Sequence, residues 1–184
     1  MLSYRKSCRI QNRANGSNVW LFVKEVWLGW LIVATTNQGI CAINFGESLQ
    51  ASIRQLQEQF PNSQVQASNP ISENWVGQVI AYLESPQKGL NLPLDIQGTA
   101  FEQRVWQALQ DIPLGNTASY KQIAQKIGNP KAARAVARAC AANRIAVAIP
   151  CHRVIGSDGS LKGYRWGSQR KKALLELEAN AISR

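Results

Sequence analysis

Apolar runs separated by short polar turns open the sequence. Residues 19–24 and 27–36 are rich in Val, Leu, Ile and Trp, the cluster TTNQG ends the second run at 35–39, and ICAINF at 40–45 is a third. Runs of this length bounded by turn residues are typical of antiparallel hairpins. The pattern predicts a small antiparallel sheet.

Two segments with helical spacing of apolar residues come next. The apolar positions are Leu49, Ile53, Leu56 and Phe60 in segment 48–60, and Trp75, Val79 and Leu83 in segment 72–83. Recurrence every three or four residues predicts amphipathic helices, so the first half of the chain is predicted to be an α/β domain. We identify no catalytic constellation in it. The Pro- and Gly-rich stretch 85–98 is the predicted boundary between domains 1–92 and 93–184.

The second half is predicted to be mainly helical. Thr99 is a candidate N-cap for a helix whose apolar stripe ends near Ile112. A shorter helix is predicted over 119–127, where Ser119 and Gln122 have the spacing of a capping box.

A tight turn connects this short helix to the next one. Gly128 is predicted to end the first helix in a left-handed conformation. Asn129 is a candidate N-cap and Pro130 a candidate first residue of the next helix, predicted over 131–144. Two capped helices joined in this way are typical of a helix-turn-helix.

The second of these two helices has a basic face. Lys131, Arg134 and Arg138 lie three or four residues apart, and most other positions are alanine. Small side chains permit close approach to DNA and basic ones can meet phosphate, which favours binding by shape with little sequence reading. A solvated charged face above an alanine-rich packing face explains the helix equally well.

Positive charge is concentrated in the same half. The 184 residues carry 21 basic and 11 acidic side chains, net +10; residues 1–92 hold seven and five, and residues 93–184 hold fourteen and six. Such an excess favours a polyanionic partner, most often nucleic acid. A basic surface that serves only solubility is the alternative.

Neither a membrane span nor an export signal is predicted. The apolar stretch 19–33 is interrupted by Lys24 and Glu25, and residues 1–13 lack the apolar core and cleavage site of a signal peptide. We therefore expect a cytoplasmic protein.

The four cysteines are Cys8, Cys41, Cys140 and Cys151. They show no CxxC spacing and the chain has one histidine, so no disulfide framework, metal site or cofactor is expected.

The stretch AVAIPCHRVIG, 146–156, places that histidine beside a cysteine. Its apolar start, 146–149, has the composition of a buried strand. A free thiol is only about 3% ionised at pH 7, and a nearby imidazole can accept its proton. Neighbouring side chains on a strand point to opposite faces, so Cys151 and His152 can meet only if the backbone turns at Pro150. Taken alone, the pair is better explained as a buried structural cysteine beside a hydrogen-bonded histidine.

The neighbouring segments favour a reactive site. The basic helix is predicted to end at residue 144, just before the apolar run into Pro150, so a short connection joins it to Cys151. The stretch 156–172 is polar, glycine-rich and basic, which suits a pocket wall against a flat ligand and phosphate. A helix predicted over 170–179 carries Glu176 and Glu178, either of which could orient the histidine.

IPCHRV, together with SYKQIA and NPKAARAVARACAANR upstream and GYRWG downstream, resembles the methylated-DNA–protein-cysteine methyltransferases, also called O6-alkylguanine-DNA alkyltransferases. GYRWG is similar to the C-terminal part of the bacterial Ada members. The likeness is close over about residues 95–180. It implies a ribonuclease H-like N-terminal domain followed by a helix-turn-helix or winged-helix C-terminal domain.

The resemblance implies a role for four residues in the reaction. Cys151 would accept the alkyl group and His152 would act as its base through a bound water. Glu178 would polarise the histidine, and Asn143 would brace the active-site turn.

The resemblance also implies the contacts with double-stranded DNA. Arg134 would enter the base stack in place of the extruded nucleotide. Tyr120 would press on the phosphate and donate a hydrogen bond to the guanine, with Lys131 and Arg138 as further DNA contacts.

A substrate pocket is implied in the same way. The carbonyls of Cys151 and Val154 would read the guanine amino group. Tyr164 would pack on the base, and the backbone of Arg165 would donate to the alkylated oxygen. Trp166 stands where some relatives have glycine, and we expect it to narrow the pocket against large alkyl groups.

The implied function is DNA repair by a monomeric, single-turnover enzyme. The protein would flip O6-alkylguanine, and O4-methylthymine as well, out of duplex DNA and transfer the alkyl group irreversibly to Cys151. Three alternatives remain: a non-catalytic helix-turn-helix regulator, an alkyltransferase-like lesion sensor, and a cysteine hydrolase.

Overall fold

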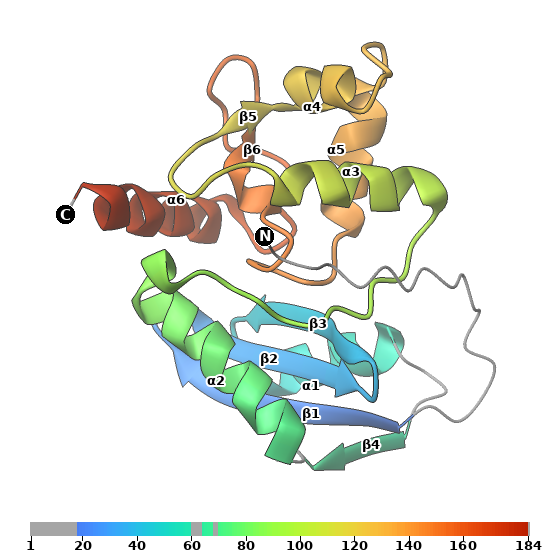
Figure 1. The fold of residues 1–184 in the computed structure, drawn as a ribbon. Coiled ribbons are helices and arrows are strands. Elements are labelled where there is room, and N and C mark those ends of the chain that lie inside the picture. The colour runs from blue at the N-terminus through green and yellow to red at the C-terminus, as the bar shows by residue number, and fades with distance from the viewer. Residues whose placement is uncertain (1–17, 60–63, 68–69, 184) are drawn as a thin grey trace.

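The computed structural model describes residues 18–59, 64–67 and 70–183 (Figure 1). The elements of the first half are β1 (Asn18–Val26), β2 (Gly29–Thr36), β3 (Gly39–Gly46), α1 (Leu49–Gln59), β4 (Gln64–Ala67), α2 (Pro70–Glu84) and the short 3₁₀ helix η1 (Pro86–Lys88). The predicted hairpins and both predicted helices are thus present. The side chain of Leu56 and residue Phe60, predicted on the first helix, lie outside the described residues.

The sheet has the strand order β3-β2-β1-β4. The first three strands are antiparallel, as predicted, and β4, which the sequence analysis missed, pairs parallel with β1. Leu31 and Val33 of β2 face the main core, whereas Ile32 and Ala34 pack in a second cluster on the opposite face. Helix α2 covers the first face and α1 lies on the second (Figure 1), which explains why β2 reads as a nearly continuous apolar run.

The second half is mainly helical, as predicted. Its elements are α3 (Ala100–Gln110), β5 (Ala118–Ser119), α4 (Tyr120–Lys126), α5 (Ala133–Ala142), the 3₁₀ helix η2 (Cys151–Arg153), β6 (Val154–Ile155) and α6 (Ser168–Ile182). Thr99 caps α3 in a capping box with Glu102, and Ser119 caps α4 with Gln122. Gly128 has the left-handed φ of 76° that the sequence analysis expected of it.

The start of α5 was predicted wrongly. The helix begins at Ala133, its N-cap is Ala132, and no side chain caps it. The Asn129 carbonyl instead accepts a hydrogen bond from the Ala132 N–H at 2.9 Å, which closes a separate turn around Pro130 and Lys131. Lys131 therefore precedes the basic helix instead of lying on it.

One hydrophobic core joins the two halves. Buried residues of β2, β3 and α2 belong to the same cluster as those of α3, α5 and α6. Ile43 of β3 also pairs with Ile145 beyond α5, and Ile40 pairs with Leu94 in the connecting segment. The boundary between residues 92 and 93 stays a prediction. No helix within the described ranges is long and apolar enough to cross a membrane.

Candidate active site

The segment before Cys151 is a compact turn, and the buried strand predicted over 146–149 was wrong. The Ala148 N–H bonds the Ala146 carbonyl at 2.6 Å across Val147, whose φ of 58° lies in the left-handed region. Around Pro150, with φ −81° and ψ 60°, the Cys151 N–H bonds the Ile149 carbonyl at 2.8 Å, the geometry of an inverse γ-turn. The backbone bend that the sequence analysis required at Pro150 is therefore present.

Asn143 holds this turn from inside. Its amide nitrogen donates to the Ile149 carbonyl at 2.9 Å and to the Cys151 sulfur at 3.1 Å, and its oxygen accepts from the Ile145 N–H at 2.9 Å. The side chain is fully buried. A β-branched residue with positive φ, such as Val147, costs about 1–3 kcal/mol and persists only where its surroundings fix it. The hydrogen bonds of Asn143 to the residues on either side of Val147 help to hold this strained conformation.

The Cys151 thiol is buried, with 3% of the residue exposed. Burial raises the pKa of this thiol to about 11, against the Asn143 hydrogen bond and the positive charges of Lys171 and Arg165, which act to lower it. In the DNA-free protein the thiol is therefore protonated at neutral pH, and forming a thiolate requires a base.

His152 is oriented by Glu178. Its Nε2 lies 2.7 Å from Glu178 Oε1, and both side chains are fully buried. A carboxylate only accepts hydrogen bonds, so Nε2 carries the proton and Nδ1 is the acceptor of a neutral imidazole. Nδ1 has no hydrogen-bond partner among the described residues. Burial lowers the pKa of His152, although the contact with Glu178 opposes this, so the imidazole is a neutral base at pH 7.

Glu178, and not Glu176, is the partner of the histidine. Burial acts to raise its pKa, but hydrogen bonds from His152 and Arg153 outweigh burial and lower the pKa to about 2. Arg153 donates from Nε to Oε2 at 2.9 Å and from Nη2 to Oε1 at 3.0 Å, and the Tyr82 hydroxyl lies 2.5 Å from Oε1. Glu176 is exposed and pairs with Lys172.

Lys171 is a buried cation that the sequence analysis missed. It is fully buried, and its Nζ donates to the Val154 carbonyl at 2.5 Å. Nζ also lies 6.0 Å from the centre of the Tyr120 ring. Burial lowers the pKa of Lys171, and the neighbouring thiols of Cys151 and Cys140 oppose that shift. Lys171 therefore links three of the predicted site residues.

The predicted pocket residues lie around this lysine and His152. The Tyr120 hydroxyl donates to the Lys162 carbonyl at 3.2 Å, and the buried Tyr164 ring packs edge-on against His152. Trp166 is anchored on β3 instead of pointing freely into a pocket. Its Nε1 donates to Asn44 at 3.2 Å, and its ring lies 5.2 Å from that of Tyr164. Trp166 thus supports Tyr164 from behind.

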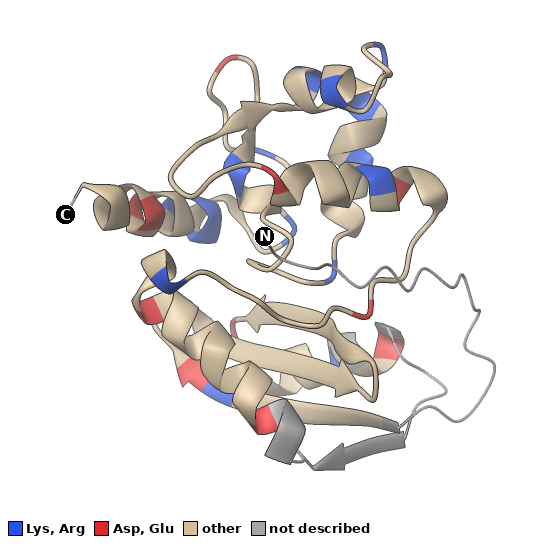
Figure 2. Cartoon of the chain, in the orientation of Figure 1, with Lys and Arg blue, Asp and Glu red and all other residues tan. Residues whose placement is uncertain are grey.

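The predicted DNA-binding cations lie on the surface. Figure 2 shows several Lys and Arg positions along α4 and α5, at the end of the molecule away from the sheet. Lys131, Arg134 and Arg138 are all exposed. No hydrogen bond, ion pair or ring contact of the described residues joins these cations to Cys151, so the basic face and the Cys151 turn, which Asn143 braces, are separate regions.

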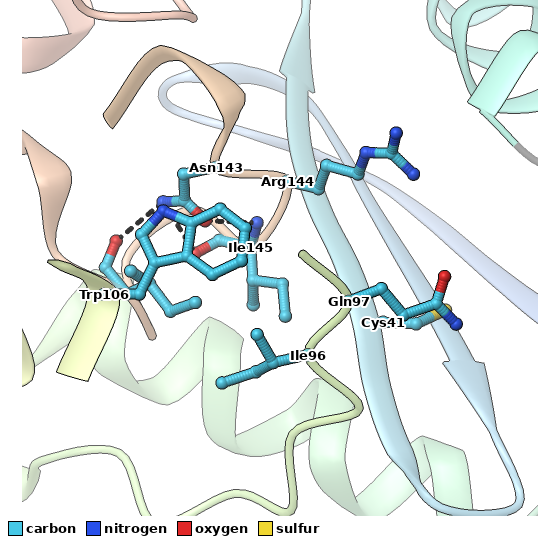
Figure 3. Close-up of a pocket in the computed structure, with 8 residues that line it drawn as sticks. Cys41, Ile96, Gln97, Trp106, Asn143, Arg144 and Ile145 are labelled. Carbon is cyan, nitrogen blue, oxygen red and sulfur yellow. Dashed lines mark hydrogen bonds between the residues drawn. The ribbon is translucent and has the colours of Figure 1, made fainter. Parts of the chain in front are cut away.

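A small hollow, partly open to solvent, lies beside Asn143 (Figure 3). It is lined by Cys41 of β3, Ile96 and Gln97 of the connecting segment, Trp106 of α3 and the residues around Asn143. Cys151 and Tyr164 do not line it. This hollow is therefore distinct from the pocket predicted for the substrate base. Within the described ranges, no cluster of three or more His, Cys, Asp or Glu side chains could hold a metal ion.

Three functional-site residues were missed from the sequence. Lys171 stands in a basic run at the start of α6, and nothing in that run indicates burial. Arg153 adjoins His152, and its ion pair with Glu178 could have been proposed from that adjacency. Tyr82 lies 96 residues from Glu178 in the sequence, and no local pattern signals their contact.

Comparison with known proteins identifies the class of protein to which this fold belongs. A family model described as 6-O-methylguanine DNA methyltransferase, DNA binding domain, matches residues 100–180. The crystal structure of Mycobacterium tuberculosis OGT in complex with DNA superposes with a TM-score of 0.74 at 37% identity, covering 89% of this chain and 94% of that chain. The fold is thus that of a DNA methyltransferase of this kind.

Curated relatives give the family. The inducible methylated-DNA–protein-cysteine methyltransferase of Bacillus subtilis is 38% identical over 152 residues, which cover 82% of this chain and 85% of that protein. The bifunctional transcriptional activator/DNA repair enzyme Ada of Escherichia coli K12 is 52% identical over 171 residues, 92% of this chain and 48% of that protein. The chain belongs to the methylated-DNA–protein-cysteine methyltransferase family, as its motifs indicated. It spans about half the length of the Ada relatives that it matches.

Proposed function

We propose that the protein repairs alkylated DNA by moving the alkyl group from O6 of guanine to Cys151. The observation that carries the proposal is the geometry of one 3₁₀ turn. It places a buried thiol against Asn143 and, on the next residue, an imidazole whose proton-accepting nitrogen is left without a protein partner by the Glu178 bond. A neutral imidazole near a protonated thiol can accept the thiol proton and then stabilise the thiolate that forms.

The reaction is a displacement at carbon. The Cys151 proton passes through a water to Nδ1 of His152, and Glu178 stabilises the imidazolium that forms. The thiolate then attacks the alkyl carbon, so an S–C bond forms as the C–O bond breaks. The electron pair leaves on guanine, whose ring accepts a hydrogen bond from the Tyr120 hydroxyl and takes up one proton from solvent. The imidazolium of His152 returns its proton to solvent, so the residues end in their original protonation states. Since no ordinary step hydrolyses the thioether product, each molecule acts once.

Base flipping supplies access to the buried thiol. An O6-alkyl group inside a duplex cannot reach Cys151, and extruding the nucleotide costs a few kcal/mol. We assign Arg134 to the vacated position in the stack, and Lys131 with Arg138 to the backbone phosphates. Their exposure on or next to α5 supports this assignment.

The flipped guanine would lie between Tyr164 and the turn that holds Cys151. The carbonyls of Cys151 and Val154 would accept from the guanine amino group, and the Arg165 N–H would donate to O6. Val154 already accepts a hydrogen bond from Lys171, but a carbonyl oxygen has two lone pairs and can accept a second bond.

Finer features of the fold belong to the same proposal. The order β3-β2-β1-β4, with β4 parallel to β1, supports a ribonuclease H-like N-terminal domain. The Gly128 turn between α4 and α5 supports a helix-turn-helix, with the segment beyond β6 as the wing. The sequence and the family resemblance also support a monomeric state, a cytoplasmic location and repair of O4-methylthymine.

Transfer of a radiolabelled methyl group tests the function. The protein is incubated with duplex DNA that carries labelled O6-methylguanine, and label on protein and in solution is counted. We expect one label per molecule, with none on Cys151→Ser. Label released in many turnovers would identify a hydrolase, and lesion binding without transfer a sensor or regulator; either result overturns the proposal. Cys41→Ser is the matched control and should accept label normally.

Trp166 is proposed to disfavour large alkyl groups by holding Tyr164 in place. Replacing it with glycine (Trp166→Gly) should raise the rate on O6-benzylguanine relative to O6-methylguanine by about tenfold. Rates are measured on both substrates after thermal unfolding shows that the variant is folded. An unchanged ratio would contradict this role.

A further inference from the structure

Tyr82 connects the N-terminal half of the chain to the reactive network. It lies on α2, is 3% exposed, and its hydroxyl is 2.5 Å from Oε1 of Glu178 on α6. The same hydroxyl lies 3.1 Å from Nη2 of Arg153. No catalytic residue was predicted from the sequence in this half.

The direction of both hydrogen bonds is fixed by chemistry. A guanidinium only donates, so Arg153 donates to the Tyr82 oxygen. The hydroxyl hydrogen is then free to point at one acceptor, the Glu178 carboxylate. Burial, followed by the charge of Glu178, raises the pKa of Tyr82 well above its usual value, so the group stays a neutral donor.

Tyr82 and His152 therefore compete for one oxygen. Oε1 accepts from Nε2 of His152 at 2.7 Å, from the Tyr82 hydroxyl, and from Arg153 at 3.0 Å. We propose that Tyr82 is a positioning residue of the alkyl-transfer site, whose hydroxyl shares this oxygen with His152 and so moderates how strongly Glu178 holds a charged imidazole. The inference rests on the proposed function for its role in the reaction, but not for the contact itself.

Removal of the hydroxyl has a defined effect on the imidazole. Without it, more of the Glu178 charge faces Nε2, and a nearby negative charge favours the protonated form of histidine. The Nε2–H bond should shorten and the pKa of His152 should rise. The titratable and charged groups packed around His152 are Tyr82 from α2, Cys151 and Arg153 from η2, Tyr164 from the segment before α6, and Lys171 and Glu178 from α6. All except Tyr82 are unchanged in Tyr82→Phe.

Nuclear magnetic resonance of the imidazole tests the inference directly. His152 is the only histidine of the chain, so its ¹⁵N and Nε2–H resonances need no assignment by mutation. In the DNA-free protein, Tyr82→Phe should move the Nε2–H resonance downfield and raise any titration midpoint by about 0.5–1 pH unit. An Nε2–H resonance and midpoint equal to those of the native protein would overturn the proposal, whether or not the protein transfers alkyl groups.

Two further variants separate positioning from packing. Gln87→Ala removes another hydrogen bond between the halves, from Gln87 to the Ala181 carbonyl at 3.0 Å, without touching Glu178. It should leave the imidazole resonances unchanged. In a Glu178→Gln background, Tyr82→Phe should have no further effect on them, because Tyr82 acts through the carboxylate. A shift in Gln87→Ala, or an undiminished shift in the double variant, would contradict the role.

The transfer reaction supplies the last measurement. The acid limb of the rate–pH profile should move up by the same 0.5–1 pH unit in Tyr82→Phe, with the plateau rate within about twofold of native. An unshifted limb with a shifted imidazole resonance would show that Tyr82 has no part in the reaction and so overturn its role there. Complete absence of transfer in the native protein would instead refute the proposed function, and the resonance experiment would still decide the contact.

Discussion

The reactive centre and the basic face of α5 differ in how their charged side chains are buried and paired. In the centre, Glu178 and Arg153 are buried and bonded to each other at 2.9 Å, and their remaining polar atoms also have partners. On the surface, Arg134 and Arg138 are exposed and form no ion pair with a described residue. The buried pair of Glu178 and Arg153 is fully hydrogen-bonded without DNA, whereas the exposed arginines have no ion-pair partner among the described residues.

This difference separates what each region contributes. Buried pairs are screened little by salt, and removal of one member leaves the other charge unsatisfied. Exposed charges are screened, and their value lies in the counterions released when phosphate binds. The rate of the chemical step should therefore change little with salt concentration, whereas the affinity for DNA should fall as the ionic strength rises.

Removal of Glu178 should have the largest effect. Glu178→Ala leaves Arg153 buried without its carboxylate, which costs about 3–5 kcal/mol in free energy of unfolding. Urea denaturation measures this cost. Glu176→Ala, two residues away and on the exposed face of α6, is the control and should change stability by less than about 0.5 kcal/mol. Equal losses in both variants would contradict the view that the network is the source of the effect.

Acid should destabilise the centre by a comparable amount. The pKa of Glu178 is about 2 in the fold against an ordinary 4.5, so its contribution is complete above about pH 4.5 and is lost as the pH falls towards 2. The loss is about 3 kcal/mol. His152 acts in the same direction from pH 6.5 downwards, because its lowered pKa lets the unfolded chain bind a proton that the folded chain does not.

Unfolding in urea between pH 7.5 and 2.5 measures this dependence. Native protein should lose stability in two stages, below about pH 6.5 and again below about pH 4.5. Glu178→Gln should lack the second stage, since glutamine does not titrate. Parallel curves for the two proteins would show that other carboxyl groups are responsible.

Replacement of Asn143 should have the next largest effect. Asn143→Ala removes the side-chain hydrogen bonds that hold the turn, including the one to the Cys151 sulfur, and leaves the buried Ile145 N–H without its acceptor. A cost of about 1–3 kcal/mol in stability is expected, with a slower transfer at every pH because the thiolate loses a donor. Asn143→Asp keeps the acceptor but not the donor, so it should restore the Ile145 contact and not the rate. A normal rate in either variant would exclude this role.

The sequence predicted regular elements better than contacts between them. Hairpins, capped helices and the Gly128 turn follow from local patterns, and the structure contains them. Strand β4 was missed because it has only four residues and its parallel pairing with β1 is a long-range feature. The turn over 146–149 was mistaken for a strand because its composition is apolar, while its shape depends on Asn143 and on the strained Val147.

The site divides in the same way. Cys151 and His152 were identified from a motif, and Glu178 was favoured over Glu176 only through the family resemblance. The contact that makes Glu178 the partner, and the Tyr82 hydroxyl that shares its oxygen, connect elements 26 and 96 residues apart. Burial of Lys171 is likewise a property of the packed structure, since its sequence neighbours Arg170 and Lys172 suggest an exposed helix start.

The surface cations should give the smallest and most salt-dependent effect. Arg138→Ala should weaken binding to alkylated and unmodified duplexes equally and lower the slope of log affinity against log salt by about 0.9, the value for one phosphate contact. Arg134→Ala should leave that slope nearly unchanged, because a side chain inside the base stack neutralises no phosphate. It should instead slow transfer from duplex DNA, where flipping is required, and spare transfer from the free base. Binding titrations at several salt concentrations and rates on both substrates measure these effects. If both variants lowered the slope equally and transferred normally, Arg134 would be one more phosphate contact, and the basic face would take part in binding alone.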